Sequence, residues 1–441
     1  SLYVMPSLGG DTFTLDTGEP GLGGSPIQLK VRQLGYNLRS EFRQRLSSIA
    51  SLAIDYALGL DFEGTYARVE TLAPVGPVGG DSQGIPVGGG DMVRDAGRSE
   101  SGFFGDNLFT DAAGASLREV LHYHLVSAAP YVISNFWFAD GRVQVSPQVR
   151  ASVDVLYLPT DAGSASAAAE ATPPAQTRLF WEPRILTRGA ILPDRLWLTV
   201  GLGVYHQAPQ GAELSPHFGN PHLEWQTGTT YIAGLDGNLP NGLHVETQGF
   251  YKDLRSLVVA DTRTGYASDG LGRAFGAQIL VRQRLWHGLT GWLAYTLSRS
   301  ERRDHPDEPW RVFRFDQTHI LTVVASYELP WGLSASARFR FATGNPTTQY
   351  IGGLRDLTYQ DYSAITGEPL AYRLPDFHQL DLRVDKTFTF NRFRLGLYLE
   401  VLNVYNRTNA ESLVYGGRQL FQEGRVSGLP VFPNLGLRAD F

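Results

Sequence analysis

Residues 393–401 read FRLGLYLEV, and this stretch decides the fold. Apolar side chains occupy every second position, with arginine, glycine, tyrosine and glutamate between them. Successive side chains of a β-strand point to opposite faces, so the pattern predicts a strand with one apolar and one polar face. The same alternation recurs in residues 333–341, 52–61 and 36–45.

Composition narrows the class of protein. The chain has 441 residues, of which 42% are hydrophobic and only 19% charged, below the roughly 25% of ordinary soluble domains. A net charge of −6 argues against a nucleic-acid partner. With no cysteine, disulfides, thiolate metal sites and cysteine nucleophiles are excluded. Apolar runs are too short for a spanning helix, which needs about 20 residues, but a membrane β-barrel remains possible.

The alternating segments predict fifteen strands of an all-β, antiparallel transmembrane barrel, with residues 2–6 as a possible sixteenth. Many of them run to about 10–15 residues, a length that suits tilted membrane strands better than the ~5–6 residues of soluble sheets. We expect strands at residues 32–46, 49–65, 121–138, 143–157, 178–189, 195–207, 224–237, 242–256, 271–286, 289–300, 316–329, 332–343, 376–390, 393–405 and 433–441.

The connections alternate between short and long. Short turns are expected at 140–142, 239–241, 287–288, 330–332 and 391–392, and long loops at 66–117, 158–177, 208–222, 254–270, 301–315, 344–375 and 406–432. Short periplasmic turns with long extracellular loops are typical of outer-membrane barrels, so we expect a multi-pass barrel in the outer membrane of a Gram-negative cell.

Aromatic residues gather near the short turns, where a membrane-interface belt would lie. The predicted belt consists of Trp137, Phe138, Trp197, Trp286, Trp331, Phe390 and Phe441. The last eight residues, NLGLRADF, form an alternating strand that ends on Phe441. They resemble the C-terminal signal that outer-membrane assembly machinery recognises, which puts Phe441 at the periplasmic rim.

A barrel this wide cannot be filled by its own side chains. Its lumen should therefore be polar, lined by Arg338, Arg340, Arg383, Asp381, Asp385 and Glu400. Five lumenal arginines could attract an anionic ligand or pair with Asp381, Asp385, Glu400 or the carboxylates of a plug, and we favour pairing: Arg282, Arg284, Arg338, Arg340 and Arg394.

Several segments of the C-terminal two thirds are similar to TonB-dependent receptors. Residues 205–235 read YHQAPQGAELSPHFGNPHLEWQTGTTYIAGL, and 242–259 read GLHVETQGFYKDLRSLVV. Four further boxes follow in the family's order: DQTH at 316–319, FATGNP at 341–346, LPDFHQLD at 374–381 and VLNVYNRTN at 401–409. Residues 27–200 fit the same barrel by pattern alone.

The resemblance implies a 22-stranded barrel with an N-terminal plug, a ligand bound from outside, and an inner-membrane protein that supplies energy. This sequence departs from that plan, because fewer strands are visible and no plug is seen. We expect residues 1–26 to be a Gly-rich N-terminal segment and residues 27–441 to be the barrel. The remaining strands and plug could belong to another polypeptide, or the barrel could close on fifteen or sixteen strands.

Three histidines, His206, His217 and His222, lie on or beside a long loop and are candidate ligand-binding residues. Haem-type receptors place a histidine where His217 stands, but a solvated loop histidine is the simpler interpretation. His122 and His124 share one strand face and could hold a metal. No third ligand accompanies them, so we expect neither a metal nor a cofactor, and we interpret them as interfacial polar residues.

The predicted function is the binding and uptake of a scarce large solute, siderophore- or cobalamin-like. The alternatives are a plug-less barrel that binds partners within an envelope complex, and a passive porin-like pore. Ser and His are abundant but nowhere distinctively arranged, so we expect no enzyme. Expected partners are outer-membrane lipid, a plug domain or second polypeptide, an inner-membrane energising protein, and other envelope proteins.

Overall fold

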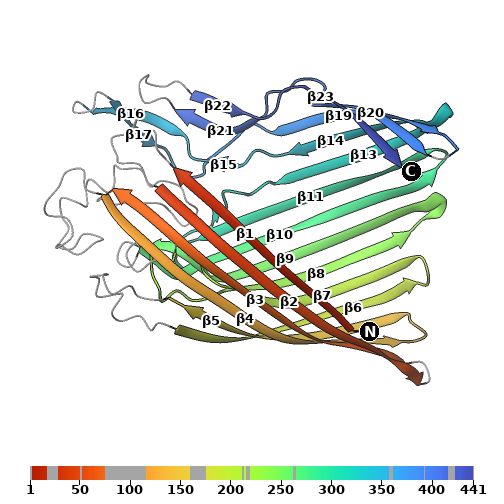
Figure 1. The fold of residues 1–441 in the computed structure, drawn as a ribbon, viewed down its shortest axis with the longest axis horizontal. Coiled ribbons are helices and arrows are strands. Elements are labelled where there is room, and N and C mark those ends of the chain that lie inside the picture. The colour runs from red at the N-terminus through yellow and green to blue at the C-terminus, as the bar shows by residue number, and fades with distance from the viewer. Residues whose placement is uncertain are drawn as a thin grey trace.

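The computed structural model describes residues 2–16, 28–49, 52–74, 116–158, 175–210, 213–214, 219–261, 265–356, 361–391, 393–415 and 423–440. Within these residues the main antiparallel sheet has 17 strands, one of which is the two-residue β12 (Arg311–Val312). The sixteen others form a curved antiparallel wall around an interior (Figure 1). They confirm the predicted fold class and strand number.

Each long strand pairs with the strands that precede and follow it. The wall strands are β1 (Leu2–Asp16), β2 (Gln28–Ile49), β3 (Leu52–Pro74), β4 (Ser116–Phe138), β5 (Val143–Tyr157), β6 (Ala175–Leu192), β7 (Leu196–Gln207), β8 (Gln226–Asn238), β9 (Leu243–Asp261), β10 (Gly265–Trp286), β11 (Leu289–Arg303), β13 (His319–Leu329), β14 (Leu333–Ala342), β19 (Phe377–Thr389), β20 (Arg394–Leu402) and β23 (Phe432–Asp440).

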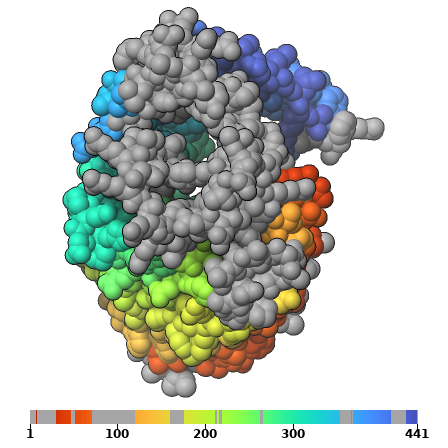
Figure 2. All heavy atoms as spheres, turned by 90° about the vertical axis from the view of Figure 1, so that its left-hand side faces the viewer, coloured from red at the N-terminus to blue at the C-terminus, as the bar shows by residue number. Residues whose placement is uncertain are grey.

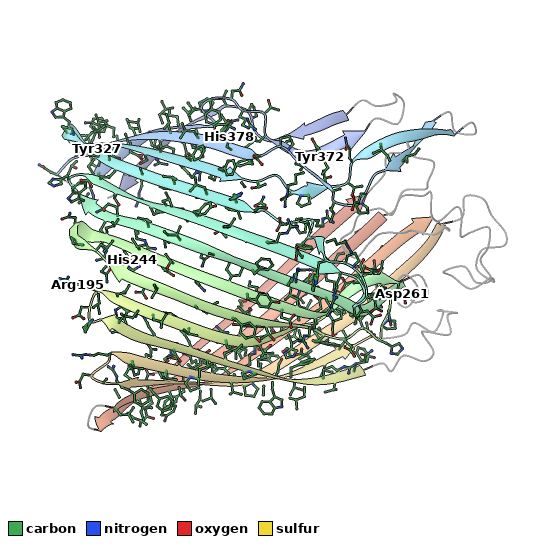
Figure 3. All side chains as sticks on the ribbon, turned by 180° about the vertical axis from the view of Figure 1, so that it is seen from behind. Arg195, His244, Asp261, Tyr327, Tyr372 and His378 are labelled. Atoms are coloured by element: carbon green, nitrogen blue, oxygen red, sulfur yellow. The ribbon has the colours of Figure 1, made fainter. Side chains whose placement is uncertain are left out.

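The sheet curves around an interior. In Figure 1 the strands β1–β3 run across β7–β9 in the opposite slant, so the first strands form the wall facing the later ones. Short turns gather at one end, including the 3-10 turns η1 (Pro240–Gly242) and η2 (Pro330–Gly332). Figure 2 looks onto the other end and shows that the interior is hollow. Figure 3 labels Arg195 at the short-turn end and Asp261 toward the long-loop end.

Small hairpins extend the long-loop end of the later strands. They are β15 (Pro346–Thr347) with β18 (Tyr372–Arg373), β16 (Tyr350–Asp356) with β17 (Asp361–Thr366), and β21 (Ala410–Tyr415) with β22 (Glu423–Ser427). Across the described ranges, no helix combines the length and apolar character that crossing a membrane would require.

The two faces of the wall differ as the alternation predicts. On β7, Leu198, Val200 and Leu202 expose 40%, 47% and 41% of their surface on the outer face. Thr199 and Gly201 between them face inward, and Thr199 lies opposite Arg188 of β6. An exposed row of aliphatic side chains is favourable in contact with lipid, whereas exposing it to water would cost free energy.

Several strands extend beyond their predicted ends. The expected loop 254–270 is largely β-structure, because β9 continues to Asp261 and β10 begins at Gly265. Residues 2–16, of which only 2–6 were expected as a possible strand and the rest as part of a Gly-rich segment, form β1 and pair along their length with β2. Above the bilayer neither face of a strand meets lipid, so the strand can continue through backbone hydrogen bonds to its neighbours without alternating apolar residues. The alternation in the sequence therefore ends before the strand ends.

The predicted aromatic belt is only partly present on the outer face. Phe138, Trp286, Trp331 and Phe390 are exposed near the short turns, whereas Phe441 lies outside the described residues. Trp137 and Trp197 point to the inner face instead: the Arg188 guanidinium carbon lies 4.5 Å from the Trp197 ring centroid. In a strand, neighbouring residues face opposite ways, so a cluster of rings in sequence cannot all reach the lipid.

The sheet has two edge strands. Among the described residues, β1 pairs with β2 and β23 with β20, while β1 and β23 share no hydrogen-bonded register. Of the two alternatives that the sequence left open, closure on fifteen or sixteen strands is therefore not found in this part of the chain. Leu435 and Leu437 of β23 are 76% and 73% exposed because only one neighbouring strand covers them.

The hydrophobic core lies inside the barrel, at the long-loop end. Its buried members are Val69, Leu121, Leu156, Leu158, Leu214, Leu223 and Trp225. Val69, Leu121 and Leu156 come from the inner faces of β3, β4 and β5. Leu214, Leu223 and Trp225 come from the segment between β7 and β8, which therefore folds inward onto the wall.

Candidate functional site

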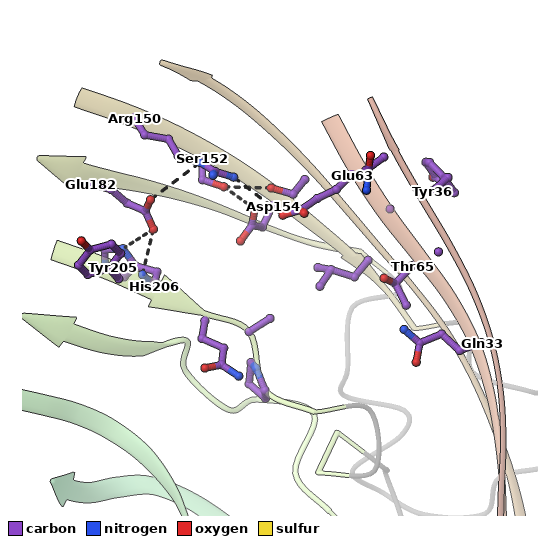
Figure 4. A pocket seen from close by; sticks show the side chains of 18 of the residues that line it. Gln33, Tyr36, Glu63, Thr65, Arg150, Ser152, Asp154, Glu182, Tyr205 and His206 are labelled. Carbon is purple, nitrogen blue, oxygen red and sulfur yellow. Dashed lines mark hydrogen bonds and ion pairs between the residues drawn. The ribbon is translucent and has the colours of Figure 1, made fainter. Parts of the chain in front are cut away.

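A polar cavity of about 1010 Å³ lies along the inner wall of β2–β7. Gln33, Glu63 and Thr65 line one side, and Arg150, Glu182, Arg184, Tyr205 and His206 line the other (Figure 4). Period-two alternation accounts for the lumenal position of these side chains except His206, which directly follows Tyr205 and departs from the alternation as its ring stacks on Phe180. The cavity has the size of a small-molecule binding site.

Its charged groups form one connected network. Arg150 lies 3.2 Å from an Asp61 carboxylate oxygen and 3.9 Å from a Glu182 oxygen. Arg39 donates to Asp61 at 2.6 Å, and Arg184 donates to Glu182 at 3.0 Å. Asp61 and Glu182 are 9% and 6% exposed, and charges this buried require partners. Carboxylates therefore compensate Arg39, Arg150 and Arg184, so the cavity does not present an uncompensated positive charge to an anion.

Neutral donors continue the network toward the long-loop end. The Ser127 and Ser152 hydroxyl oxygens are 3.0 Å apart, and Ser152 donates to Asp154 at 2.7 Å. The indole N–H of Trp225 donates to the other Asp154 oxygen at 3.0 Å. Trp225 thus couples the inward-folded segment to the polar wall.

His206 is the only one of the three candidate histidines that the described structure places in the cavity. Its ring stacks on Phe180 with a centroid separation of 4.5 Å, and its Nδ1 atom lies 3.7 Å from Glu182. Its backbone N–H also donates to Glu182, at 2.9 Å. His222 is exposed nearby, where its N–H donates to Asn220. His217 lies outside the described residues.

The three candidate arginines have different surroundings. Arg338 forms an ion pair of 2.7 Å with Asp381, whose side chain is 3% exposed. Arg340, two residues along the same face, lies over the Phe377 ring at 5.4 Å, and within the described residues its Nε atom is buried without a hydrogen-bond partner. Arg394 faces Thr389 and Asp440 near the short-turn end, so it does not belong to the cavity.

Burial alters acid–base behaviour in the inward-folded segment. Desolvation raises the pKa of Glu213 above its usual range, although the Gln210 N–H that donates to it acts in the opposite direction. Burial also raises the pKa of the nearby Tyr266 hydroxyl, and the Glu213 carboxylate adds to that effect. In the described ranges, no group of three or more His, Asp or Glu side chains could hold a metal ion.

Residues 15–404 match the family described as TonB dependent receptor-like, beta-barrel. This chain belongs to that family. It is therefore an outer-membrane protein of Gram-negative bacteria, as the resemblance implied. No curated protein sequence matches it.

Solved receptors of the same fold are similar to this TonB-dependent receptor-like barrel. The ferric-catecholate import receptor Fiu of Escherichia coli K12, in its closed form, aligns with a TM-score of 0.60 at 13% identity, covering 99% of this chain and 59% of Fiu. The ferric preacinetobactin receptor BauA of Acinetobacter baumannii gives 0.63 at 11%, covering 99% and 60%. The ferric citrate transporter FecA gives 0.67 at 12%, covering 100% and 59%. This chain thus spans about three fifths of each of these three structures.

The TonB-receptor boxes read from the sequence have structural roles at strand ends. Asp316 is 1% exposed; it accepts the Ser300 N–H at 2.6 Å and the Arg373 guanidinium at 2.5 Å. Arg373 also donates to the carbonyl of Gly344 at 3.0 Å. A Cβ at Gly344 would lie 1.7 Å from the Leu374 carbonyl oxygen, so only glycine fits there.

A second buried group of hydrogen bonds, centred on Asn403, fixes the end of β20. Asn403 is 1% exposed, and its side-chain N–H donates to the carbonyls of Arg407 and Leu429. Its backbone N–H donates to Asp381 at 2.9 Å. The asparagine of the last box therefore shapes the extracellular turn, and the box need not touch a ligand.

Sequence reasoning missed most of the cavity. Arg150, Glu182 and Arg184 carry its charge, yet they lie in the part of the chain where no family box was recognised. The available signal was a polar or charged residue at most second positions of β5 and β6, alternating with mainly apolar residues. That pattern marks a lumenal face but does not show which lumenal faces meet.

Proposed function

We propose that this barrel belongs to a receptor that binds and imports a ferric siderophore or a related iron chelate. The observation that carries the proposal is the lumenal cavity of about 1010 Å³ beneath the inward-folded segment. It lies toward the extracellular end and presents arginine, tyrosine, serine and histidine donors to a solute that carries many acceptor oxygens. The similar solved structures include receptors named for ferric catecholate and ferric preacinetobactin, and a transporter named for ferric citrate.

Transport would require further partners. We propose a plug domain inside the lumen and an inner-membrane energising protein, as the family's name implies dependence on TonB. In the cavity wall, buried carboxylates and arginines already pair with one another. No unpaired charge is therefore left to hold the bound solute strongly, which would favour its release during transport.

The test is a binding titration of the folded chain in detergent. Ferric citrate, a ferric catecholate and cobalamin serve as probes, with Trp225 fluorescence as the readout because its indole N–H bonds to the cavity wall. We expect saturable binding of an iron chelate, weakened about 10-fold by Arg150→Gln, since a hydrogen bond to a charged group contributes roughly 1.5–3 kcal/mol. Arg195→Gln, at a periplasmic turn, is the control and should leave affinity unchanged.

Two outcomes would replace the proposal. Large, permanent conductance in lipid bilayers without chelate binding would indicate a pore. Stoichiometric recovery with other envelope proteins, again without chelate binding, would indicate a partner-binding barrel.

A further inference from the structure

The lumenal cavity is surrounded by equal numbers of positive and negative side chains. Counted over the described side chains, the cavity wall and the residues paired with it supply four arginines and four carboxylates. They are Arg39, Arg150, Arg178 and Arg184, and Asp61, Glu63, Asp154 and Glu182. Their formal charges cancel, so the wall has no net charge with which to attract an ionic solute.

The carboxylates are more open to a solute than the arginines are. Glu63 exposes 61% of its side chain to the cavity, and its carboxylate lies 3.9 Å from Arg150 (Figure 4). Arg150 and Arg184 are only 24% and 30% exposed, and both lie against Glu182. A solute that enters therefore meets a free-standing carboxylate, whereas the guanidinium groups are already covered by partners.

Asp154 adds a second negative group whose hydrogen bonds come from neutral donors. The Ser152 hydroxyl and the Trp225 indole N–H donate to its two oxygens, at 2.7 and 3.0 Å. Arg178 lies opposite Asp154 across β5 and β6, but its guanidinium carbon stacks over the Trp225 ring at 5.7 Å. The negative charge of Asp154 thus remains next to the cavity.

The arginines cannot leave their partners to hold an anion. Asp61 and Glu182 are 9% and 6% exposed, and both depend on Arg150. Drawing Arg150 away would leave two buried carboxylates with less compensation, which costs more free energy than a surface ion pair returns. Arg150 can offer a further N–H to an oxygen of the solute, but it cannot neutralise a charged solute.

The rest of the polar lining recognises oxygen and nitrogen atoms without regard to net charge. Amides and hydroxyls contribute here, and they come from four strands of the wall: Gln33, Asn37, Thr65, Tyr205 and Gln207 line the cavity. Such groups hydrogen-bond to an uncharged solute at little desolvation cost.

We propose that the cavity selects a ferric chelate without net charge, and that Glu63 rejects anionic chelates. This inference rests on the proposed function and names the class of chelate. Three donors of one negative charge each, such as hydroxamates, cancel the charge of ferric iron, whereas three doubly charged catecholates leave a trianion. A trianion would lose its hydration in a cavity whose own charges already cancel, and Glu63 would repel it.

The experiment is equilibrium dialysis of the full chain, folded in an uncharged detergent, against two iron chelates. Ferrichrome, an uncharged ferric tris-hydroxamate, should bind at least about 10-fold more tightly than a trianionic ferric tris-catecholate. Glu63→Gln should narrow the ratio of the two affinities by about 3- to 10-fold, because it removes a charge that only the anionic chelate feels. Glu328→Gln makes the same change at an exposed carboxylate near the short-turn end of β13, and should leave the ratio unchanged.

The possible failures can be told apart. Equal or tighter binding of the ferric tris-catecholate by the unaltered chain would overturn this inference and leave the proposed function standing. A ratio that Glu63→Gln leaves unchanged would refute the role of Glu63. Binding of neither chelate would overturn the proposed function itself. Because both affinities are measured on one preparation of each variant, a partial folding defect lowers both alike and does not alter their ratio.

Discussion

At the scale of single residues, the wall depends on a few buried polar groups where strands meet extracellular loops. Asp316 joins the end of β11, the start of β13 and the segment before β19 through Ser300 and Arg373. Buried pairs of this kind contribute little net free energy compared with a well-packed apolar alternative, but removing one partner is costly. Such residues determine which loop geometry forms.

Asp316→Ala should therefore destabilise the folded barrel by about 3–5 kcal/mol, because it leaves the Arg373 charge unpaired. The measurement is the urea midpoint of unfolding, followed by the mobility difference between folded and unfolded barrel on a gel. Asp253→Ala removes an exposed pair with Arg255 and should leave the midpoint unchanged. Equal shifts in the two variants would refute the structural role assigned to Asp316.

At the scale of strands, the fold could largely be predicted from the sequence. Alternation fixed fifteen strands and the inward face of Arg338 and Arg340, because one side of each strand meets lipid and the other does not. The belt prediction failed for Trp137 and Trp197, because it grouped aromatic residues by their position near a turn. Whether a strand residue faces the lipid or the lumen changes with each step along the chain, and both tryptophans fall on the lumenal side. Alternation failed for β9 and β10 above the bilayer, where backbone pairing alone sustains the strands.

Two neighbouring residues of β7 test this assignment of faces. Val200→Arg places a cation in the lipid and should cost about 2–4 kcal/mol of folding free energy. Thr199→Arg turns the same charge into the lumen, opposite Arg188 and its partner Asp236, and should still cost less because the lumenal face is polar. Folding yield in vesicles and the urea midpoint both report the difference. If Thr199→Arg were the more damaging change, the inner and outer faces would have been assigned the wrong way round.

At the scale of the whole molecule, the cavity arises from strands far apart in sequence, which explains why it escaped prediction. Gln33 of β2 and His206 of β7 line the same space only because the sheet curves. The segment after β7 covers this space by packing onto β3–β5. Neither feature leaves a local pattern, since curvature and loop docking depend on the assembled wall.

Docking of that segment should weaken as pH rises. The docked state raises the pKa of Glu213, so it binds the proton more tightly than the undocked state does. Docking is then most favourable below the ordinary glutamate pKa, and this advantage is lost between that value and the raised one. The protection factors of residues 219–225, which are hydrogen-exchange rates corrected for the pH dependence of a free amide, should be lower at pH 8 than at pH 5. Glu213→Gln should abolish the difference; a variant that kept it would assign the effect to another group.

The position of Leu214 and Leu223, each 1% exposed, limits how the extracellular opening can behave. Swinging their segment outward would hydrate two leucines, at about 1.5–3 kcal/mol each. The segment should consequently stay inside except for rare excursions, and an arriving solute meets an aperture that is already narrowed. The barrel would therefore select solutes by size at its extracellular opening even before a ligand binds.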